Sequence, residues 1–449
     1  MRPVHGSSRA QTLIQNVTHL LRARRFMPLF ATQFLGAFND NLFRTATIIL
    51  VIYGIYRNAA QEAVFSGVAS AVFILPFFLL SALSGQLADA NDKARIIRII
   101  KTAEILIMVA GAAGLVLQNS PLLLLALGSM GVHSTFFGPI KYAILPQHLE
   151  PDEVLGGTGL VEAGTYIAIL GGTILGGLLV LQRPDGSYHA ELAAVGVLVV
   201  AIFGRIAGAF VPAAPPAEDT ELPGYPHRGM DWHILRASIT LVRGTMHIRR
   251  LFLAIMAISF FWAMGAVLAA QFTPLVKNVF QGTTGVATLF LAIFSVGVAT
   301  GSLAINRLLR GEVAARFAPS AAIAMGLFVL LLYLLCHHWP HSSGLVTVRE
   351  FLSRTAGVLV VVDLFFVAVA GGMFVVPLYA FLTTTVPKSE TARTVAANNI
   401  VNSGAMVAGY ALYIALLVLH VSISETLLLV AAASLVAAWL GWKLHLACD

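Results

Sequence analysis

In the stretch Gln33–Arg44, QFLGAFNDNLFR, polar and charged side chains interrupt the first apolar run of the chain, which extends from Pro28 to about Tyr56. A run of this length can cross a bilayer as one helix, because about 20 residues suffice. A charged group near the bilayer centre costs on the order of 3 kcal/mol. We therefore expect Asp40 to line a polar cavity. The alternative is that Asp40 and Arg44, one helical turn apart, only neutralise each other.

The composition indicates an all-α membrane protein. Of the 449 residues, 58% are hydrophobic and 11% are charged, and the mean hydropathy is +0.85, whereas soluble proteins carry about 25% charged residues. The net charge of +7 does not indicate a nucleic-acid partner, because the basic residues follow membrane topology. The two cysteines define no disulfide framework. The first residues are polar and mixed, so we expect no cleavable signal peptide.

The apolar runs predict twelve transmembrane helices in two groups of six. The polar, proline-rich segment 213–248 separates the groups, and a short amphipathic helix is expected to begin near Asp231. The predicted parts are an N-terminal segment 1–26, a six-helix bundle 27–212, the linker 213–248 and a second bundle 249–446. The predicted spans are 27–56, 64–85, 95–117, 121–145, 155–181, 191–212, 249–277, 284–308, 317–338, 355–383, 393–420 and 424–445.

Lysine and arginine predict the orientation. Twenty of the 28 basic residues lie on the side that holds both termini and the linker, five lie on the other side and three fall within spans. Cytoplasmic loops carry such an excess, so both termini are expected in the cytoplasm. This count places Lys93, Arg95, Arg98 and Lys101 in the loop between spans two and three.

Short similarities between the halves predict an internal repeat. RRF at 24–26 matches RRL at 249–251, GQLA at 85–88 matches GSLA at 301–304, and GLVEAG at 159–164 matches NIVNSG at 399–404. All three pairs fall at corresponding spans. This pattern favours two parallel repeats related by an axis along the membrane normal.

The loop after span two resembles the signature loop of the major facilitator superfamily. It reads Gly85-x-Leu-Ala-Asp89 and continues to Lys93 and Arg95, with Asp92 where that family usually has glycine. Gly85 would let two helices approach, and Asp89 could cap a helix. The resemblance implies the major facilitator fold and a gating role for Gly85, Asp89, Lys93 and Arg95.

Four motifs together look more narrowly like the lysophospholipid transporter family: QFLGAFNDN at 33–41, GPIKYAILP at 138–146, GLVEA at 159–163 and GMFVVPL at 372–378. The resemblance implies a flippase that moves lysophosphatidylethanolamine, lysophosphatidylglycerol and related lysolipids from the outer to the inner leaflet of the bacterial inner membrane. An acyltransferase partner would re-acylate them there. The sequence contains no His-x-x-x-x-Asp acyltransferase motif, so we expect a transporter and not an enzyme.

Charged residues in spans four and five are candidate headgroup ligands. Lys141 follows Gly138-Pro139, where the proline should kink or break the helix, and its ammonium could bind a phosphate. A lysine that snorkels to the interface is the alternative. Glu162 could take the lipid amine or pair with Lys141, and a purely structural ion pair with Lys141 or Arg44 is also open.

Amide side chains complete the predicted substrate site. The family's standalone members carry an arginine in span seven near Gln271, where this chain has alanines instead. That departure shifts the expected phosphate ligand to Lys141 and Arg44. The asparagines of span eleven could contact substrate or form interhelical hydrogen bonds. The predicted substrate-binding residues are Asp40, Arg44, Lys141, Glu162, Asn39, Asn41, Gln271, Asn398 and Asn402.

The sequence predicts no cofactor, although a coupling sodium ion or proton could bind at Asp40 or Glu162. His337, His338 and His341 lack the carboxylates or cysteines that would complete a metal site, and no P-loop is present. We expect a monomer. Two rival functions remain at this stage. One is proton-coupled export of small hydrophobic compounds, and the other is a membrane scaffold that transports nothing.

Overall fold

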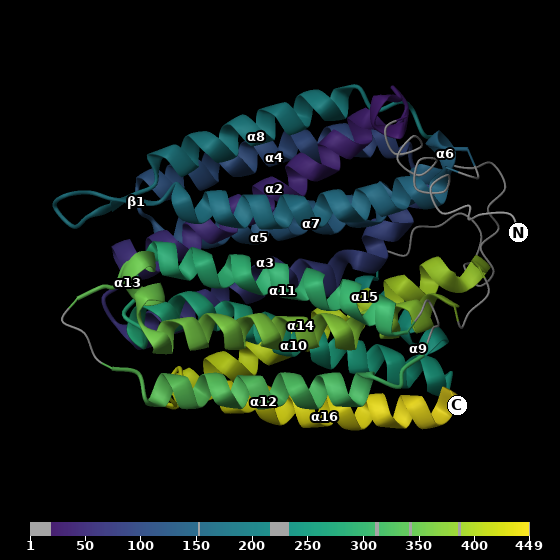
Figure 1. Cartoon of the computed structure of the whole chain (residues 1–449). Helices are drawn as coiled ribbons and strands as arrows, with labels where there is room; N and C mark the ends of the chain where they lie inside the picture. The colour runs from purple at the N-terminus through teal and green to yellow at the C-terminus, as the bar shows by residue number, and fades with distance from the viewer. Residues whose placement is uncertain are drawn as a thin grey trace, which may run out of the picture.

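The computed structural model describes residues 19–150, 153–215, 233–309, 314–340, 344–384 and 388–448. Within these residues, each predicted span corresponds to one long helix (Figure 1). The predicted limits are mostly met within a few residues, although α3 and α15 each start five residues earlier than expected. The long helices are α2 (Met27–Leu50), α3 (Ala59–Ala90), α4 (Lys93–Val116), α5 (Ser120–Ala143), α7 (Val154–Leu178), α8 (Glu191–Ala209), α10 (Arg249–Asn278), α11 (Thr284–Leu308), α12 (Ala318–His337), α14 (Thr355–Thr384), α15 (Lys388–Val418) and α16 (Thr426–Cys448).

Short elements join these helices. A single turn of π-helix, η1 (Val51–Ile55), continues α2, and β1 (Leu181–Gln182) pairs antiparallel with β2 (Tyr188–His189) between α7 and α8. The short helices are α6 (Leu145–His148), α9 (Ile234–Met246) and α13 (Val348–Ser353). The amphipathic helix expected in the linker is thus present as α9.

Ten of the long helices are long and apolar enough to cross a membrane by length and composition, within the described residues. Two others, α2 and α7, are not among these ten, although they run beside the rest (Figure 1). In α2 the polar stretch 33–44 lowers the mean hydropathy. The helix that departs from the apolar pattern in this way carries the predicted site residues Asn39, Asp40, Asn41 and Arg44.

Local sequence accounts for several helix ends. The side chain of Asn58 accepts hydrogen bonds from the backbone of Ala60 and Gln61 and so caps α3. Asp92 accepts from the backbone N–H of Arg95 at 3.0 Å and caps α4. Both are residue types favoured at this position. The expected break at Pro139 does not occur, because α5 continues through it to Ala143.

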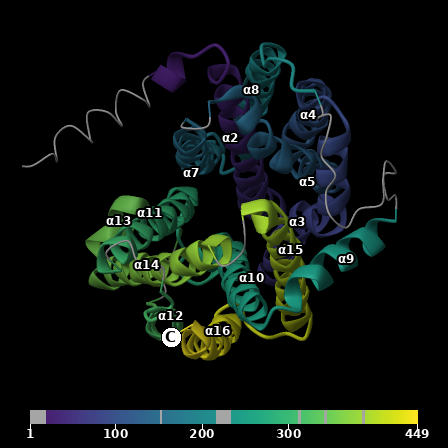
Figure 2. The same ribbon diagram turned by 90° about the vertical axis from the view of Figure 1, so that its right-hand side faces the viewer.

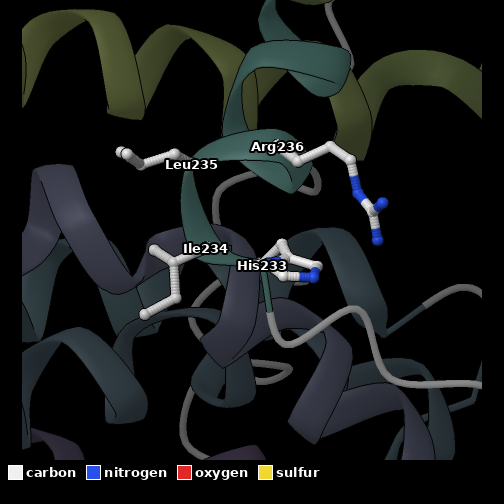
Figure 3. A pocket seen from close by; sticks show the side chains of 4 residues that line it. All are labelled: His233, Ile234, Leu235 and Arg236. Carbon is white, nitrogen blue, oxygen red and sulfur yellow. The ribbon is translucent and has the colours of Figure 1, made fainter.

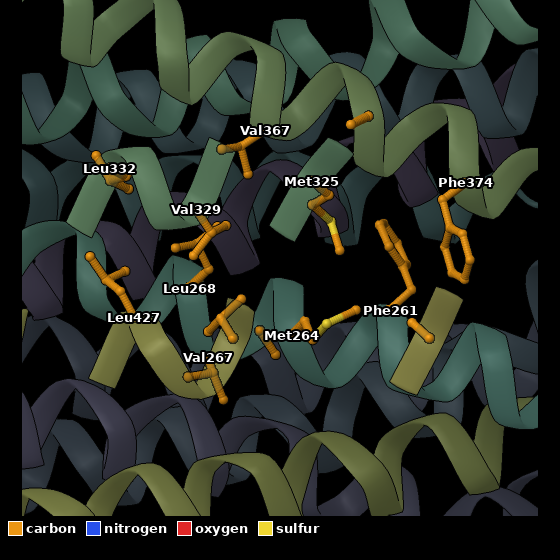
Figure 4. Close-up of a cluster of buried hydrophobic side chains, with 14 of the residues drawn as sticks. Phe261, Met264, Val267, Leu268, Met325, Val329, Leu332, Val367, Phe374 and Leu427 are labelled. Atoms are coloured by element: carbon orange, nitrogen blue, oxygen red, sulfur yellow. The ribbon is translucent and has the colours of Figure 1, made fainter. Parts of the chain in front are cut away.

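The long helices form two bundles (Figure 2). Within the first, α2 packs on α7, α3 on α5 and α4 on α8. The second repeats these pairings with α10 on α15, α11 on α14 and α12 on α16. The same connectivity in both halves supports the parallel repeat that the sequence motifs indicated. An apolar core fills the second bundle, where side chains of α10, α12, α14 and α16 interdigitate (Figure 4).

The two ends of the molecule differ. The "α13 end" carries β1, β2 and α13, and the "α9 end" carries α6, α9 and the C-terminal end of α16 (Figure 1). At the α13 end, Lys277 of α10 pairs with the buried Glu62 of α3, and Asn278 donates to Glu62 at 2.8 Å. Tyr53 also donates to the backbone carbonyl of Gly282 at 2.8 Å. These contacts close the α13 end between the bundles.

A second closure at the same end joins α7 and α11. A Cβ atom placed on Gly177 would lie 2.0 Å from the hydroxyl oxygen of Thr288. Further inside the first bundle, a Cβ on Gly172 would lie 2.2 Å from the carbonyl oxygen of Phe38. Glycine is required where backbones approach this closely, so the glycines of α7 permit close contact with α2 and α11.

Helix α9 lies across the seam between the bundles at its own end. Ala237 and Leu241 pack against Ala82 of α3 and against Ala397 and Ile400 of α15. The opposite face of α9 is exposed, and its first turn borders a shallow hollow (Figure 3). The hollow is lined by His233, Ile234, Leu235 and Arg236. Helix α9 therefore holds α3 and α15 together where the linker enters the second bundle.

Candidate functional site

Asp40 meets a partner on another helix of its bundle. The hydroxyl of Ser134 on α5 donates to Asp40 Oδ2 at 2.5 Å. The other carboxylate oxygen, Oδ1, is buried and has no hydrogen-bond partner among the described residues. Arg44 is not within ion-pair distance of Asp40 among the described salt bridges. The alternative in which Asp40 and Arg44 neutralise each other is therefore wrong.

Arg44 turns away from Asp40 and contacts Asn41 of α2 and Phe73 of α3. Its guanidinium donates to Asn41 Oδ1 at 3.0 Å and lies 5.6 Å from the centre of the Phe73 ring. It is also close enough to act electrostatically on Tyr410 of α15. The amide of Asn41 in turn donates to the backbone carbonyl of Ala37. Opposite charges one turn apart on α2 thus point to different surroundings.

A fully buried ionic cluster lies behind Asp40. Lys101 Nζ is 2.6 Å from Glu104 Oε2, and both side chains have no exposed surface. Asn39 donates to Glu104 Oε1 at 2.9 Å, and His133 Nε2 lies 3.3 Å from Glu104 Oε2. Asn39 is therefore committed to Glu104. Sequence reasoning missed this cluster, although Lys101 and Glu104 fall on one face of a helix at i and i+3.

The placement of Lys101 corrects an expectation. The charge count put Lys101 in the loop between spans two and three, but it lies two turns inside α4 and is completely buried. Glycines on neighbouring helices make room for it. A Cβ on Gly36 would lie 2.8 Å from Lys101 Nζ, and one on Gly204 would lie 3.4 Å from it. The ammonium thus fills a space that α2 and α8 leave open.

The second bundle contributes a polar network. Ser259 donates to Asn402 Oδ1 at 2.7 Å, and the amide of Asn402 donates to the hydroxyl of Tyr379 at 3.3 Å. Trp262 donates to the same hydroxyl at 2.7 Å. Such interhelical hydrogen bonds contribute about 0.6 kcal/mol on average. Asn402 therefore takes part in helix contacts, which was one of the two roles considered for the asparagines, whereas neither amide atom of the buried Asn398 has a hydrogen-bond partner among the described residues.

Gln271 of α10 is completely buried. Neither amide atom has a hydrogen-bond partner among the described residues. An unsatisfied buried amide costs roughly 1–3 kcal/mol. Its position in the half of α10 toward the α13 end places it close to the contacts that join the bundles there.

The remaining predicted headgroup ligands are only partly described. Lys141 is half-buried in the last turn of α5, at the α9 end. Glu162 lies in the first half of α7, but its side chain is outside the described part of the structure. The expected pairing of Lys141 with Glu162 therefore stays a prediction.

The four predicted gating residues lie in different surroundings. A Cβ on Gly85 would meet no atom within 4 Å, so the expected close helix approach at Gly85 is wrong for this conformation. Asp89 lies within α3, its side chain is outside the described residues, and Asp92 caps α4 instead. The backbone N–H of Lys93 donates to the carbonyl of Ala214 at 3.0 Å, and Arg95 is exposed. The gating role itself stays a prediction.

Among the described residues, no group of three or more His, Cys, Asp or Glu side chains could hold a metal ion. His337 and His338 lie at the end of α12, and His341 is outside the described residues.

Curated relatives match most of the chain. A protein of Citrobacter koseri named lysophospholipid transporter LplT is 26% identical over 398 residues, covering 87% of this chain and 88% of the relative. The protein of the same name from Cronobacter sakazakii is 27% identical over 401 residues, covering 88% and 89%.

Solved structures share the fold at low sequence identity. An auto-inhibited POT family peptide transporter has a TM-score of 0.69 at 12% identity and covers 94% of this chain and 96% of its own. A D-xylose–proton symporter has a TM-score of 0.66 at 12% identity, with 94% and 97% covered. A bacterial homologue of the human lysosomal transporter Spinster, inward-facing and unoccupied, has a TM-score of 0.61 at 16% identity, with 94% and 98% covered.

The sequence profile of the Major Facilitator Superfamily matches residues 29–410, which is most of the chain. The match covers the helices that hold Asp40, the Lys101–Glu104 pair and Asn402. Together with two similar six-helix bundles, it establishes that this chain belongs to the major facilitator superfamily, a family of membrane transporters.

Proposed function

We propose that this protein transports lysophospholipids across the bilayer by alternating access. The observation that carries the proposal is the separation of Asp40 from Arg44. They stand one turn apart on α2, yet Asp40 bonds to Ser134 and Arg44 to Asn41. The site thus offers an anion and a cation that do not neutralise each other. A zwitterionic headgroup needs both, one for its amine and one for its phosphate.

The curated relatives support this substrate class, because they are named lysophospholipid transporters and align over most of the chain. Arg44 carries the planar guanidinium that suits a phosphate, and it lies within electrostatic range of Tyr410 of the opposite bundle. Asn398 and Asn402 lie on α15, the same helix as Tyr410. We infer that the headgroup binds between α2 and α15, while the single acyl chain lies among apolar side chains.

The contacts described above hold the α13 end closed between the bundles. The excess of Lys and Arg at the α9 end favours a cytoplasmic location, so we infer that both termini and α9 face the cytoplasm of a bacterial inner membrane. Lysolipid would enter from the outer leaflet and be delivered to the inner leaflet, where an acyltransferase would consume it. Transport would be coupled to a sodium ion or a proton, and the protein would work as a monomer.

Uptake of labelled lysophosphatidylethanolamine into proteoliposomes tests the proposal. The wild-type protein should transport it, and Asp40→Asn, which keeps the side-chain size, should reduce the rate at least about tenfold, as expected for losing roughly 1.4 kcal/mol of binding. Thr300→Val, on an exposed part of α11, is the control and should transport normally. Uptake by Asp40→Asn at the wild-type rate would refute the role of its charge.

The same vesicles distinguish the export of small hydrophobic compounds. An exporter would show proton-dependent efflux of such compounds and no uptake of lysolipid. That result would overturn the proposed substrate, while the family assignment would stand.

A further inference from the structure

The first bundle contains more buried ionisable groups than headgroup binding requires. Lys101 and Glu104 from α4 have no exposed surface, and His133 from α5 is nearly as buried. Asp40 from α2 joins them through Ser134. Charged residues inside a membrane are costly and are expected to serve a function. The role proposed above uses Asp40 alone, which leaves His133 and the Lys101–Glu104 pair unexplained.

His133 lies between the two carboxylates. On one side its Nε2 is 3.3 Å from Glu104 Oε2. On the other its Nδ1 is 3.5 Å from Ser134 Oγ, and that hydroxyl gives its own hydrogen to Asp40. Both ring nitrogens therefore lie near an acceptor, although Nε2 makes no hydrogen bond within the described part of the structure. A neutral imidazole carries a single N–H, whereas the imidazolium carries two, so only the protonated ring could serve both acceptors.

The charge balance of the cluster also favours a protonated His133. With His133 neutral, one cation, Lys101, faces two carboxylates, Glu104 and Asp40. With His133 protonated, the positive and negative charges are equal. A buried group of charges is tolerated when it is paired and hydrogen-bonded. Protonation of His133 therefore removes a net charge that would otherwise stay in a region without solvent.

Other charged groups do not alter this balance among the described residues. On α2, Arg44 is turned toward Asn41. On α3, Glu62 is bound by Lys277 at the α13 end, and the side chain of Asp89 is outside the described residues. On α8, Arg205 donates to Thr102 on the exposed side of α4.

We propose that His133 is a proton-binding site, held between Glu104 and the Ser134–Asp40 pair, and that its proton is released when a cationic headgroup binds Asp40. The inference rests on the function proposed above. An amine at Asp40 supplies the positive charge that the imidazolium supplied before. The proton passes from His133 Nδ1 to Ser134 Oγ while Ser134 gives its own hydrogen to Asp40 Oδ2, and Asp40 passes that proton to water before the amine pairs with the ionised carboxylate. Ser134 and Asp40 are the half-buried members of the cluster. Histidine is suited to this exchange, because its charge changes near neutral pH.

Proton release tests the proposal directly. Lysophosphatidylethanolamine is added to the purified full-length protein in weakly buffered detergent solution, with choline in place of sodium, and binding heat and pH are followed together. The wild type should release up to about one proton per bound lipid, the capacity of one imidazolium. His133→Gln should still bind the lipid but release none. His337→Gln, exposed at the end of α12, is the matched control and should behave as the wild type.

Two results would overturn the proposal: lipid binding without proton release in the wild type, or unchanged release in His133→Gln. Release that appears only when sodium is added would assign the effect to sodium instead. If His133→Gln does not fold, Ser134→Ala cuts the path between His133 and Asp40, and release on lipid binding should be lost there.

A separate measurement does not depend on the substrate. Nitrogen-15 spectra of histidine-labelled protein, recorded as a function of pH without lipid, should show a titrating histidine signal that disappears in His133→Gln. Absence of lipid binding together with this signal would refute the proposed function and keep the proton site. Lipid binding without this signal would do the reverse.

Discussion

Lys101 Nζ lies 2.6 Å from Glu104 Oε2, and neither side chain has any surface exposed to its surroundings. The pair is therefore isolated from solvent, and Lys101 lies closer to Glu104 than His133 does, at 2.6 Å against 3.3 Å. Removal of one partner leaves an uncompensated buried charge, whereas removal of both does not. This asymmetry makes the pair a sensitive probe of the first bundle.

Lys101→Met should destabilise the folded protein by about 3–5 kcal/mol, because Glu104 would stay buried without its cation. The double substitution Lys101→Met with Glu104→Gln should recover most of that loss. Thermal unfolding in detergent, followed by tryptophan fluorescence, measures both variants. Lys443→Met, near the end of α16 and not in a described ion pair with a carboxylate, serves as control. Equal destabilisation by the single and double variants would contradict this reading of the pair.

The ion pair between Lys277 and Glu62 should hold the α13 end closed. Glu62→Gln removes the charge that Lys277 binds and should shift the balance toward opening about tenfold, which corresponds to roughly 1.4 kcal/mol. Spin labels at the exposed positions Ala59 and Arg349, measured by double electron–electron resonance, would report a longer distance in the variant. An unchanged distance distribution would mean that Tyr53 and Gly282 suffice to hold the bundles together.

Two glycines in long helices should respond oppositely to alanine. Gly172→Ala would place a Cβ 2.2 Å from the Phe38 carbonyl oxygen and force α7 away from α2, whereas Gly85→Ala meets nothing within 4 Å. Overpacking typically costs about 1–3 kcal/mol, while alanine in an open helical position gains up to about 1 kcal/mol. Melting temperatures of the two variants should therefore fall for Gly172→Ala and hold or rise for Gly85→Ala. A loss of stability in Gly85→Ala would indicate a close approach in another conformation.

His148 should make stability depend on pH at the α9 end. Burial lowers the pKa of His148 below its ordinary value of 6.5, the opposing contribution being its contact with the carbonyl of Ala213. The unfolded chain therefore binds this proton more readily, so stability rises as pH increases toward 6.5 and is fully present above it. Between pH 7.5 and pH 5.5 the wild type should lose more stability than His148→Gln. Parallel melting curves for the two proteins would contradict this.

The helices were predicted well from the sequence because the pattern that specifies each of them lies within its own residues. A span requires about 20 apolar residues in a row, and that property is visible without knowing what the helix packs against. The same holds for the amphipathic pattern of α9 and for the polar stretch in α2.

The partners of the charged residues were not predictable in this way. Ser134 stands 94 positions from Asp40, and Glu104 stands 65 from Asn39. Lys101 was expected in a loop because a lysine near the start of an apolar run usually marks the cytoplasmic side. Its burial depends on Gly36 and Gly204, which belong to two other helices. Such a space exists only once the bundle has formed, so no local sequence pattern predicts it.

The polar side of α2 has a consequence for how the protein is made. When α2 leaves the ribosome, α4 and α5 have not been synthesised, so Asn39 and Asp40 have neither Glu104 nor Ser134 to bond. Insertion of a newly made α2 into lipid on its own is therefore energetically unfavourable. It must linger beside the insertion machinery, or keep its polar side toward water, until roughly the first third of the chain has been translated. Biogenesis of this bundle is thus an ordered assembly in which the first helix is completed by later ones.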